Sequence, residues 1–391
     1  MNSFTYYSPT KVIFGKGAEE KVGEEIRAWG GTKVLVHVGG SSAKKSGLLD
    51  RVERSLKAAG LSYMILGGVV PNPRLALVHQ GIELCRKEGV DFVLAVGGGS
   101  VIDSAKAIAM GVHFGGDVWD IYDKGAQPGK VLPTANILTL AAAGSETSKS
   151  SVLTNEDGLI KKGYGSDLLR PRFTMMNPEL TYTLPAYQTA CGIVDIMMHT
   201  FERYFSPGGV NEMSDRIAET LIKIVVEFGK KAIENPTDYE ARSEVMWAGS
   251  VSHNDLTGLG HEGDWATHQI EHELSGYYDV AHGAGLAAIW GSWARYVYKA
   301  DLPRFARYAS AVWGIENADP DAAALQGIKK TEEYFTSIGM PINITQLIGK
   351  EISDEVIEEL AEKCTFFGRR KIGGLMVLDK PQIIGIYKAA R

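Results

Sequence analysis

The 391-residue chain lacks the features that would place it in a membrane, in a secretory pathway or on nucleic acid. No stretch approaches the roughly 18 continuous apolar residues that a membrane-spanning helix needs. The segment from Met1 to Tyr7 has neither the basic region nor the apolar core of a signal peptide, so we expect a cytoplasmic protein. The three cysteines are widely separated, which fits reduced thiols rather than a disulfide framework. The 41 basic residues are outnumbered by 47 acidic ones, and the net charge of −6 argues against a nucleic-acid or anionic-membrane partner.

The first half of the chain alternates short apolar segments with amphipathic ones. Residues 33–38, 63–66, 92–96, 137–140 and 173–176 are predicted to form strands, and residues 48–59, 75–87 and 101–110 helices. Near-continuous apolar strands that alternate with helices are typical of a parallel sheet buried on both faces. We therefore predict an α/β, Rossmann-like domain over residues 1–184.

The pattern changes after Leu184, where strand-like runs almost disappear. Long stretches with helical periodicity follow at 188–203, 214–233, 239–251 and 285–297. The sequence thus predicts a second, all-helical domain over residues 185–391.

A glycine triplet, Gly97-Gly98-Gly99, follows the third predicted strand and precedes a helix. Glycines let backbone amides approach a ligand closely, and the amides and dipole at a helix N-terminus favour a phosphate group. The usual G-x-G-x-x-G fingerprint is absent, because Ile102 occupies the third glycine position. The loop indicates nucleotide binding, with a tight turn that binds nothing as the alternative.

A second loop, Gly39-Gly40-Ser41-Ser42-Ala43-Lys44-Lys45, follows the first predicted strand. Many NAD-binding proteins carry an acidic residue near this position, which binds the ribose hydroxyls. Here there are glycines, hydroxyls and two lysines instead, which would accept a ribose phosphate. The loop therefore favours NADP(H) over NAD(H), unless it is only a solvated turn.

Histidines and one aspartate recur at helical spacing in the second half. Asp195 and His199 are four residues apart, as are His268 and His272, so each pair shares one helix face. His282 follows at the start of the next predicted helix. A carboxylate with several imidazoles suits a divalent transition metal. The remaining nearby histidines, His253 and His261, lack such pairing and are interpreted as ordinary polar residues.

The same region allows a second interpretation. The segment from His268 to His272 fits H-x-x-E-H, in which two histidines bind zinc and Glu271 acts as general base of a metallopeptidase. This reading leaves the glycine loops of the first half unexplained.

Taken together, these residues resemble the iron-containing (group III) alcohol dehydrogenase family, and in particular its NADPH-dependent butanol dehydrogenases and aldehyde reductases. The resemblance covers nearly the whole chain and rests on segments 9–17, 71–73, 97–106, 144–147, 183–185, 195–199 and 265–285. Departures occur at Ala141-Ala142-Ala143, where the family usually has hydroxyl residues near the cofactor, at Asn177-Pro178 and at Ile289-Trp290-Gly291.

The resemblance implies a role for each matching residue. Asp195, His199, His268 and His282 match the family's metal ligands, and His272 matches a catalytic histidine beside the nicotinamide and the substrate. The matching cofactor-binding positions are Gly39, Gly40, Ser41, Asn72, Gly97, Gly98, Gly99, Ser100, Asp103, Thr139, Thr147, Lys161, Leu180 and Thr183.

The implied activity is reversible hydride transfer between NADP(H) and a primary alcohol or aldehyde such as butanol or butanal. The implied architecture is that of dehydroquinate synthase, assembled as a homodimer. The expected metal is one divalent ion, Fe²⁺ with Zn²⁺ as the alternative, because nitrogen and oxygen ligands accept both. A glycerol or diol dehydrogenase of the same fold is the alternative within this architecture.

Overall fold

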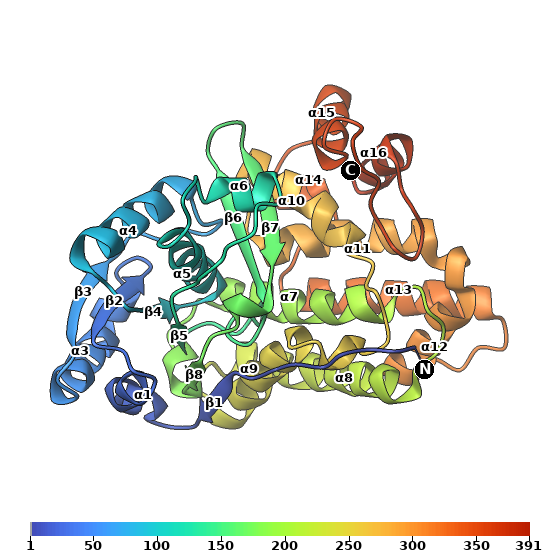
Figure 1. Ribbon diagram of the computed structural model, residues 1–391. Helices are drawn as coiled ribbons and strands as arrows, with labels where there is room; N and C mark the ends of the chain where they lie inside the picture. Colours follow the sequence, from blue (N-terminus) through green and yellow to red (C-terminus); the bar gives the residue numbers. More distant parts are fainter. Residues whose placement is uncertain (1) are drawn as a thin grey trace. The chain divides into compact units, whose positions relative to one another are not determined.

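The computed structural model describes residues 2–391, which divide into two units. One unit is Tyr7–Leu184, and the other is Pro185–Arg391 together with residues 2–6. The first is an α/β unit with a parallel sheet and the second is helical, so the predicted fold class is confirmed (Figure 1).

Six parallel strands form the sheet of the α/β unit, in the order β1-β8-β5-β4-β2-β3. Val38 pairs with Val96, Gly97 with Leu138, and Leu138 with Met176, so these four strands end at one edge of the sheet. The strands are β1 (Lys11–Phe14), β2 (Lys33–Val38), β3 (Ser62–Leu66), β4 (Phe92–Gly97), β5 (Thr134–Leu138) and β8 (Phe173–Met176). Residues that follow strands β2, β4, β5 and β8 are therefore neighbours in space.

The predicted bounds of one strand are wrong. The strand expected at 137–140 is β5, which begins at Thr134 and ends at Leu138. The first part of the strand was not predicted because Thr134 and Asn136 are polar, although both are buried. Asn136 is satisfied inside the protein, where it accepts a hydrogen bond from Thr174. At its end, Leu140 leaves the sheet and lies beside Gly98.

Helices cover both faces of this sheet (Figure 1). Val34, Val36 and Val38 point toward the face that α1 and α3 cover, in one apolar core. On the opposite face His37 is fully buried, and its Nε2 lies 2.8 Å from Ser104 Oγ on α5. The helices of the unit are α1 (Val22–Ala28), α2 (Ser42–Lys45), α3 (Leu48–Ala58), α4 (Leu75–Glu88), α5 (Gly99–Gly111) and α6 (Trp119–Asp123).

An antiparallel hairpin that the sequence pattern did not indicate packs against α5. It consists of β6 (Ser150–Asn155) and β7 (Ile160–Gly165). Alternation in β7 is weak, since it reads Ile-Lys-Lys-Gly-Tyr-Gly, so the local pattern does not identify it as a strand.

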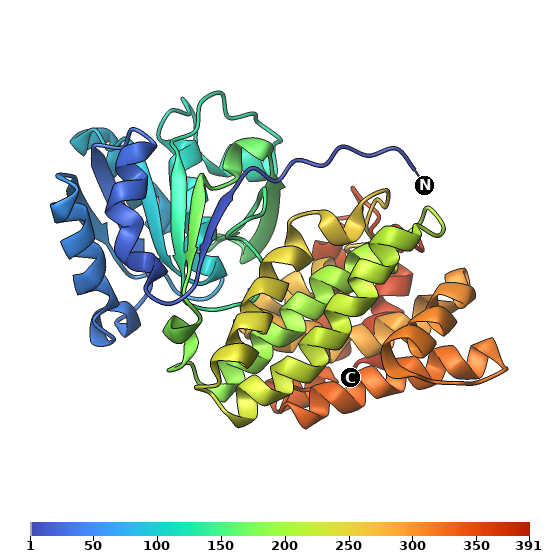
Figure 2. The same cartoon turned by 90° about the horizontal axis from the view of Figure 1, so that it is seen from below.

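The second unit is built from ten α-helices within residues 2–391 (Figure 2). Helix α7 is its centre: it contacts α8, α9 and α11, and nearly all of its side chains from Thr189 onward are buried. The helices are α7 (Ala186–Tyr204), α8 (Glu212–Glu234), α9 (Tyr239–His253), α10 (Ala266–Tyr278), α11 (His282–Val297), α12 (Leu302–Trp313), α13 (Pro320–Ser337), α14 (Ile344–Ile348), α15 (Asp354–Cys364) and α16 (Lys380–Ala389). None of the helices within residues 2–391 is both long enough and apolar enough to cross a membrane.

Candidate metal centre and cofactor edge

Three neighbouring helices of the helical unit bring the aspartate and three histidines together. Asp195 and His199 lie one turn apart on α7, His268 lies in the first turn of α10, and His282 begins α11. The Nε2 atoms of all three histidines face the same oxygen of Asp195. Asp195 Oδ1 is 3.5 Å from Nε2 of His199, 3.9 Å from that of His268 and 3.8 Å from that of His282.

This arrangement fits a divalent metal ion. Asp195, His199 and His268 are buried, and His268 Nε2 has no hydrogen-bond partner among residues 2–391. A buried polar atom without a partner is costly unless a ligand completes it. Burial, followed by the nearby His253, holds the pKa of His199 well below its usual value, so its imidazole is neutral and able to bind a cation.

Two buried glutamates accept hydrogen bonds from the Nδ1 atoms of two of these histidines, the ring nitrogens that do not face Asp195. Glu202 Oε1 accepts hydrogen bonds from the backbone N–H of His268 at 3.0 Å and from its Nδ1 at 2.9 Å. Glu271 accepts hydrogen bonds from Nδ1 of His282 and from the hydroxyl of Ser275. The sequence interpretation missed both roles, although Asp195, His199 and Glu202 are spaced as one helix face.

His199 has a different environment, which the sequence interpretation also missed. Its ring centroid is 4.0 Å from that of His253, and His253 Nδ1 accepts a hydrogen bond from Arg203. The Arg203 guanidinium lies over the Trp265 ring, and Trp265 has a left-handed backbone (φ 65°) at the start of α10. His253 is therefore part of the surroundings of the site, whereas Nε2 of His261 lies 3.1 Å from Asp215 Oδ1, in hydrogen-bond contact.

His272 lies beside the cluster. Its ring centroid is 5.6 Å from that of His282 and 6.4 Å from that of His268. The side chain of His272 is half-buried, whereas that of His268, one turn earlier on α10, is buried. An imidazole in this position can exchange protons with solvent.

The peptidase interpretation is not supported by this geometry. A general base must face the attacking water, but both carboxylate oxygens of Glu271 bind other side chains, those of Ser275 and His282. Glu271 is also fully buried.

In the α/β unit, the two glycine loops meet at the edge where the strands end. Gly97 closes β4, and its carbonyl accepts a hydrogen bond from the N–H of Thr139. A Cβ at Gly39 would lie 3.5 Å from Val101, so the end of β2 adjoins the start of α5. The carboxyl edge of a parallel sheet is where nucleotides bind in this architecture.

This edge leaves room for a ligand at two of its glycines, Gly40 and Gly99. A Cβ at Gly40 would meet no atom within 4 Å, and one at Gly99 would meet only Ala143, at 3.6 Å. Gly40 and Ser41 are exposed. The edge and the amides that begin the 13-residue helix α5 fit a dinucleotide phosphate.

Asp103 lies on α5, and its carboxylate accepts hydrogen bonds from other residues of the protein. One carboxylate oxygen accepts the Ser145 hydroxyl at 2.5 Å, and the other accepts the N–H of Val152 at 3.0 Å. One turn further along, Lys106 is fully buried and donates to the backbone carbonyls of Ser145, Ser148 and Ser150. Burial lowers the pKa of Lys106 to about 8. The two side chains anchor segment 145–152 to α5.

The other expected cofactor residues are spread around this anchor and the sheet edge. Asn72 is buried with a left-handed backbone (φ 56°), and the buried Lys161 pairs across the hairpin with Thr154. The carbonyl of Thr147 accepts a hydrogen bond from the buried Arg170. Past the end of β8, Leu180 packs against the sheet core and Thr183 is exposed.

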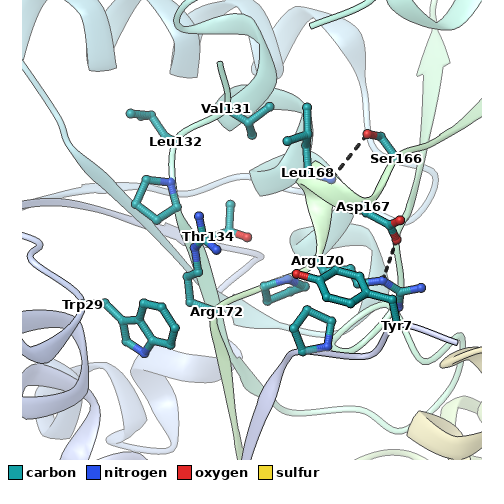
Figure 3. A pocket seen from close by; sticks show the side chains of 13 residues that line it. Tyr7, Trp29, Val131, Leu132, Thr134, Ser166, Asp167, Leu168, Arg170 and Arg172 are labelled. Atoms are coloured by element: carbon teal, nitrogen blue, oxygen red, sulfur yellow. Dashed lines mark hydrogen bonds and ion pairs between the residues drawn. The ribbon is translucent and has the colours of Figure 1, made fainter. Parts of the chain in front are cut away.

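A cavity of about 400 Å³ opens at the other end of the strands (Figure 3). Thr134, which begins β5, lines it together with Arg170 and Arg172. Asp167 pairs with Arg170 at 2.9 Å, and Arg172 lies over the Trp29 ring. The glycine loops follow the carboxyl ends of β2 and β4, at the opposite edge of the sheet. This cavity is therefore separate from the edge where the cofactor is expected to bind.

Comparison with known proteins agrees with the geometry over the whole chain. Residues 9–178 match the family model described as iron-containing alcohol dehydrogenase, and residues 189–391 match the C-terminal model of the Fe-containing alcohol dehydrogenase family. The chain is 43% identical over 391 residues to NADH-dependent butanol dehydrogenase A of Clostridium acetobutylicum, covering 99% of each chain. It is 34% identical over 400 residues to the NADPH-dependent aldehyde reductase YqhD of Escherichia coli, covering 100% of each.

Solved structures give the same result. The crystal structure of NADH-dependent butanol dehydrogenase A from Thermotoga maritima superposes with a TM-score of 0.96 at 38% identity, covering 100% of this chain and 99% of that one. A 1,3-propanediol oxidoreductase structure gives a TM-score of 0.87 at 26% identity, with both chains fully covered. The chain belongs to the iron-containing alcohol dehydrogenase family and is an NAD(P)-dependent oxidoreductase.

Proposed function

We propose that the protein is a metal-dependent aldehyde reductase and alcohol dehydrogenase that interconverts primary alcohols and aldehydes such as butanol and butanal, with NADP(H) preferred over NAD(H). The observation that carries the proposal is the convergence of three imidazole nitrogens on Asp195 Oδ1.

Asp195, His199, His268 and His282 would hold one divalent ion, with Fe²⁺ expected and Zn²⁺ as the alternative. When bound, the ion supplies a Lewis acid for the substrate oxygen, and the nicotinamide ring donates or accepts the hydride. One carboxylate and three neutral imidazoles leave a divalent ion with a net positive charge, which suits an electrophilic role.

His272 would move the proton. Oxidation of an alcohol removes a hydride from carbon and a proton from oxygen, so the site needs a group that passes that proton to solvent. His272 supports this role because it is half-buried and adjoins His268 and His282.

The preference for NADP(H) is supported by the loop that follows β2. Gly40 and Ser41 are exposed, the space at Gly40 is open, and the loop carries Lys44 and Lys45 without a carboxylate. A 2′-phosphate would meet no negative charge from this loop. The names of the relatives differ on this point: the butanol dehydrogenases A of Clostridium acetobutylicum and Thermotoga maritima are named NADH-dependent, and YqhD is named NADPH-dependent.

Gly40→Asp tests the cofactor preference. A carboxylate would repel the 2′-phosphate and could bind the ribose hydroxyls, so we expect the ratio of kcat/KM for NADPH over NADH to fall by at least roughly tenfold. Gly129→Asp is the matched control, because Gly129 is an exposed glycine with the same open surroundings. A wild-type preference for NADH would contradict the proposed NADP(H) preference and leave the rest of the proposal intact.

The activity itself is tested by cofactor consumption with butanal, using protein reconstituted with Fe²⁺ or Zn²⁺ and a chelator-treated sample. His268→Ala is expected to lose both the metal and the turnover, while the exposed His113→Ala should keep both. Metal-loaded protein that does not reduce butanal would contradict the proposed substrate. Glycerol and short diols are then the next substrates to assay, because a 1,3-propanediol oxidoreductase shares the fold.

Two further properties belong to this proposal. We expect a homodimer, measurable by sedimentation, and a cytoplasmic location, measurable by cell fractionation.

A further inference from the structure

We propose that Glu202 and Glu271 are positioning residues for the metal site: Glu202 orients the ring of His268 toward the ion, and Glu271 orients that of His282. The inference rests on the metal-dependent function proposed above. It assigns a task to two buried carboxylates that lie outside the four-ligand set.

The hydrogen bonds determine which nitrogen of each ring faces Asp195. A carboxylate only accepts, so Nδ1 of His268 and Nδ1 of His282 must carry the proton that each donates to its glutamate. In a neutral imidazole the lone pair is then on Nε2, the atom that faces Asp195 Oδ1 in both residues. The glutamates therefore select the tautomer that can bind a cation.

Glu202 holds His268 at two points. Its Oε1 accepts both the backbone N–H and the ring Nδ1–H of His268, which ties the ring to the first turn of α10. Its other oxygen, Oε2, is buried without a hydrogen-bond partner among residues 2–391. A buried carboxylate that has only neutral donors is poorly compensated, and a cation on the far side of His268 would supply the missing charge.

Glu271 holds His282 from the neighbouring helix. Its two oxygens bind Ser275, one turn further along α10, and His282, which begins α11. The close packing is possible because residue 285 is glycine: a Cβ there would lie 2.7 Å from Glu271 Oε1. Nδ1 of His199 has neither such a carboxylate nor any other hydrogen-bond partner among residues 2–391. Two of the three histidines are thus held by carboxylates and the third by ring packing.

Leucine and glutamine variants separate the hydrogen bond from the charge. Glu202→Leu and Glu271→Leu remove both. Glu202→Gln keeps an amide oxygen that can accept both His268 bonds, and Glu271→Gln can accept from His282 while its amide donates to the Ser275 hydroxyl. Glu219→Gln is the matched control: it removes the charge of another buried glutamate, which binds Tyr204 and Arg307 instead of a ligand histidine.

The readout is Co²⁺ affinity, measured in metal-free full-length protein by competition with a chromophoric chelator, together with the absorption spectrum of the Co²⁺-loaded protein. We expect each leucine variant to bind Co²⁺ about 10- to 100-fold more weakly, with altered d–d bands. The glutamine variants should lose less affinity and keep the wild-type bands, because the rings stay oriented. The control should change the melting temperature while leaving Co²⁺ affinity within about twofold of wild type.

Leucine variants that bind Co²⁺ within about twofold of wild type, with an unchanged spectrum, would overturn the inference. If the leucine variants do not fold, Glu202→Asp and Glu271→Asp decide it, because they keep the charge on a side chain that is one methylene shorter and draws back from the histidine ring. Co²⁺ affinity more than about twofold weaker, with altered bands, supports the inference, and wild-type affinity with wild-type bands overturns it. No alcohol is present in these measurements. Wild-type protein that binds one Co²⁺ but fails to reduce butanal would therefore contradict the proposed function alone.

Discussion

Helix α11 begins so close to α7 that one methyl group is expected to disturb the metal centre. The substitution is Gly283→Ala, next to His282. A Cβ at residue 283 would lie 2.1 Å from the carbonyl oxygen of Cys191, and 2.7 and 2.8 Å from its carbonyl carbon and Cα. All three atoms belong to the backbone of α7, so no side chain can turn aside to make room.

The size of the effect follows from that contact. Carbon atoms approach favourably at about 3.5–4.0 Å, so α11 must move away from α7 by roughly 1 Å or more. Such overpacking costs about 1–3 kcal/mol of the free energy of unfolding. Metal sites tolerate changes of only about 0.2 Å in ligand distance, and His282 would move with its helix, so metal affinity should fall by at least roughly tenfold.

Metal-free protein would be unfolded in urea, and Co²⁺ affinity would be measured in a separate titration. Gly385→Ala is the matched control, since it makes the same change inside helix α16, where the new Cβ would lie 3.6 Å from Tyr296. There alanine should raise stability by about 0.5–1 kcal/mol through its helix propensity, without any change in metal binding. If Gly283→Ala matched Gly385→Ala in both measurements, the close approach of α11 to α7 would not control the site, and the reasoning would be refuted.

Three further predictions concern other parts of the molecule. Burial lowers the pKa of His37 to about 4, so the unfolded chain takes up more protons as pH falls through the ordinary value of 6.5, and stability is lost between those values. The loss should reach about 2 kcal/mol at about pH 5, seen as a smaller pH dependence of urea unfolding in His37→Gln than in metal-free wild type. Lys106→Met removes the hydrogen bonds that anchor segment 145–152 to α5. We expect it to lower the free energy of unfolding of the α/β unit by about 3–5 kcal/mol and to raise the KM for NADPH. An unchanged KM would show that the segment does not position the cofactor. Chelation should lower the melting temperature of the helical unit, and restored Fe²⁺ or Zn²⁺ should raise it in a concentration-dependent way; a melting temperature independent of metal would contradict a site formed in the native state.

Much of the fold could be predicted because the signals are local. The apolar runs at 33–38 and 173–176 match β2 and β8, and the helical periodicity of residues 239–251 lies within α9. The prediction failed where polar residues are buried, because a hydropathy pattern treats polar residues as exposed. Strand β5 contains the buried polar residues Thr134 and Asn136, and its start was placed three residues late. The β6–β7 hairpin was missed because its stability comes from packing against α5, which a local pattern does not contain.

The sequence by itself determined which residues could carry the chemistry. The spacing between Asp195 and His199 and the position of Gly97–Gly99 after a strand depend only on helix and strand geometry, so they can be read along the chain. Only the tertiary structure decided how these groups meet. Glu202 lies 66 residues from His268, and the sequence carries no local trace of their hydrogen bond. Such contacts depend on how α11 packs against both α7 and α10, because side chains distant in sequence are brought into register only by the burial of the faces between them.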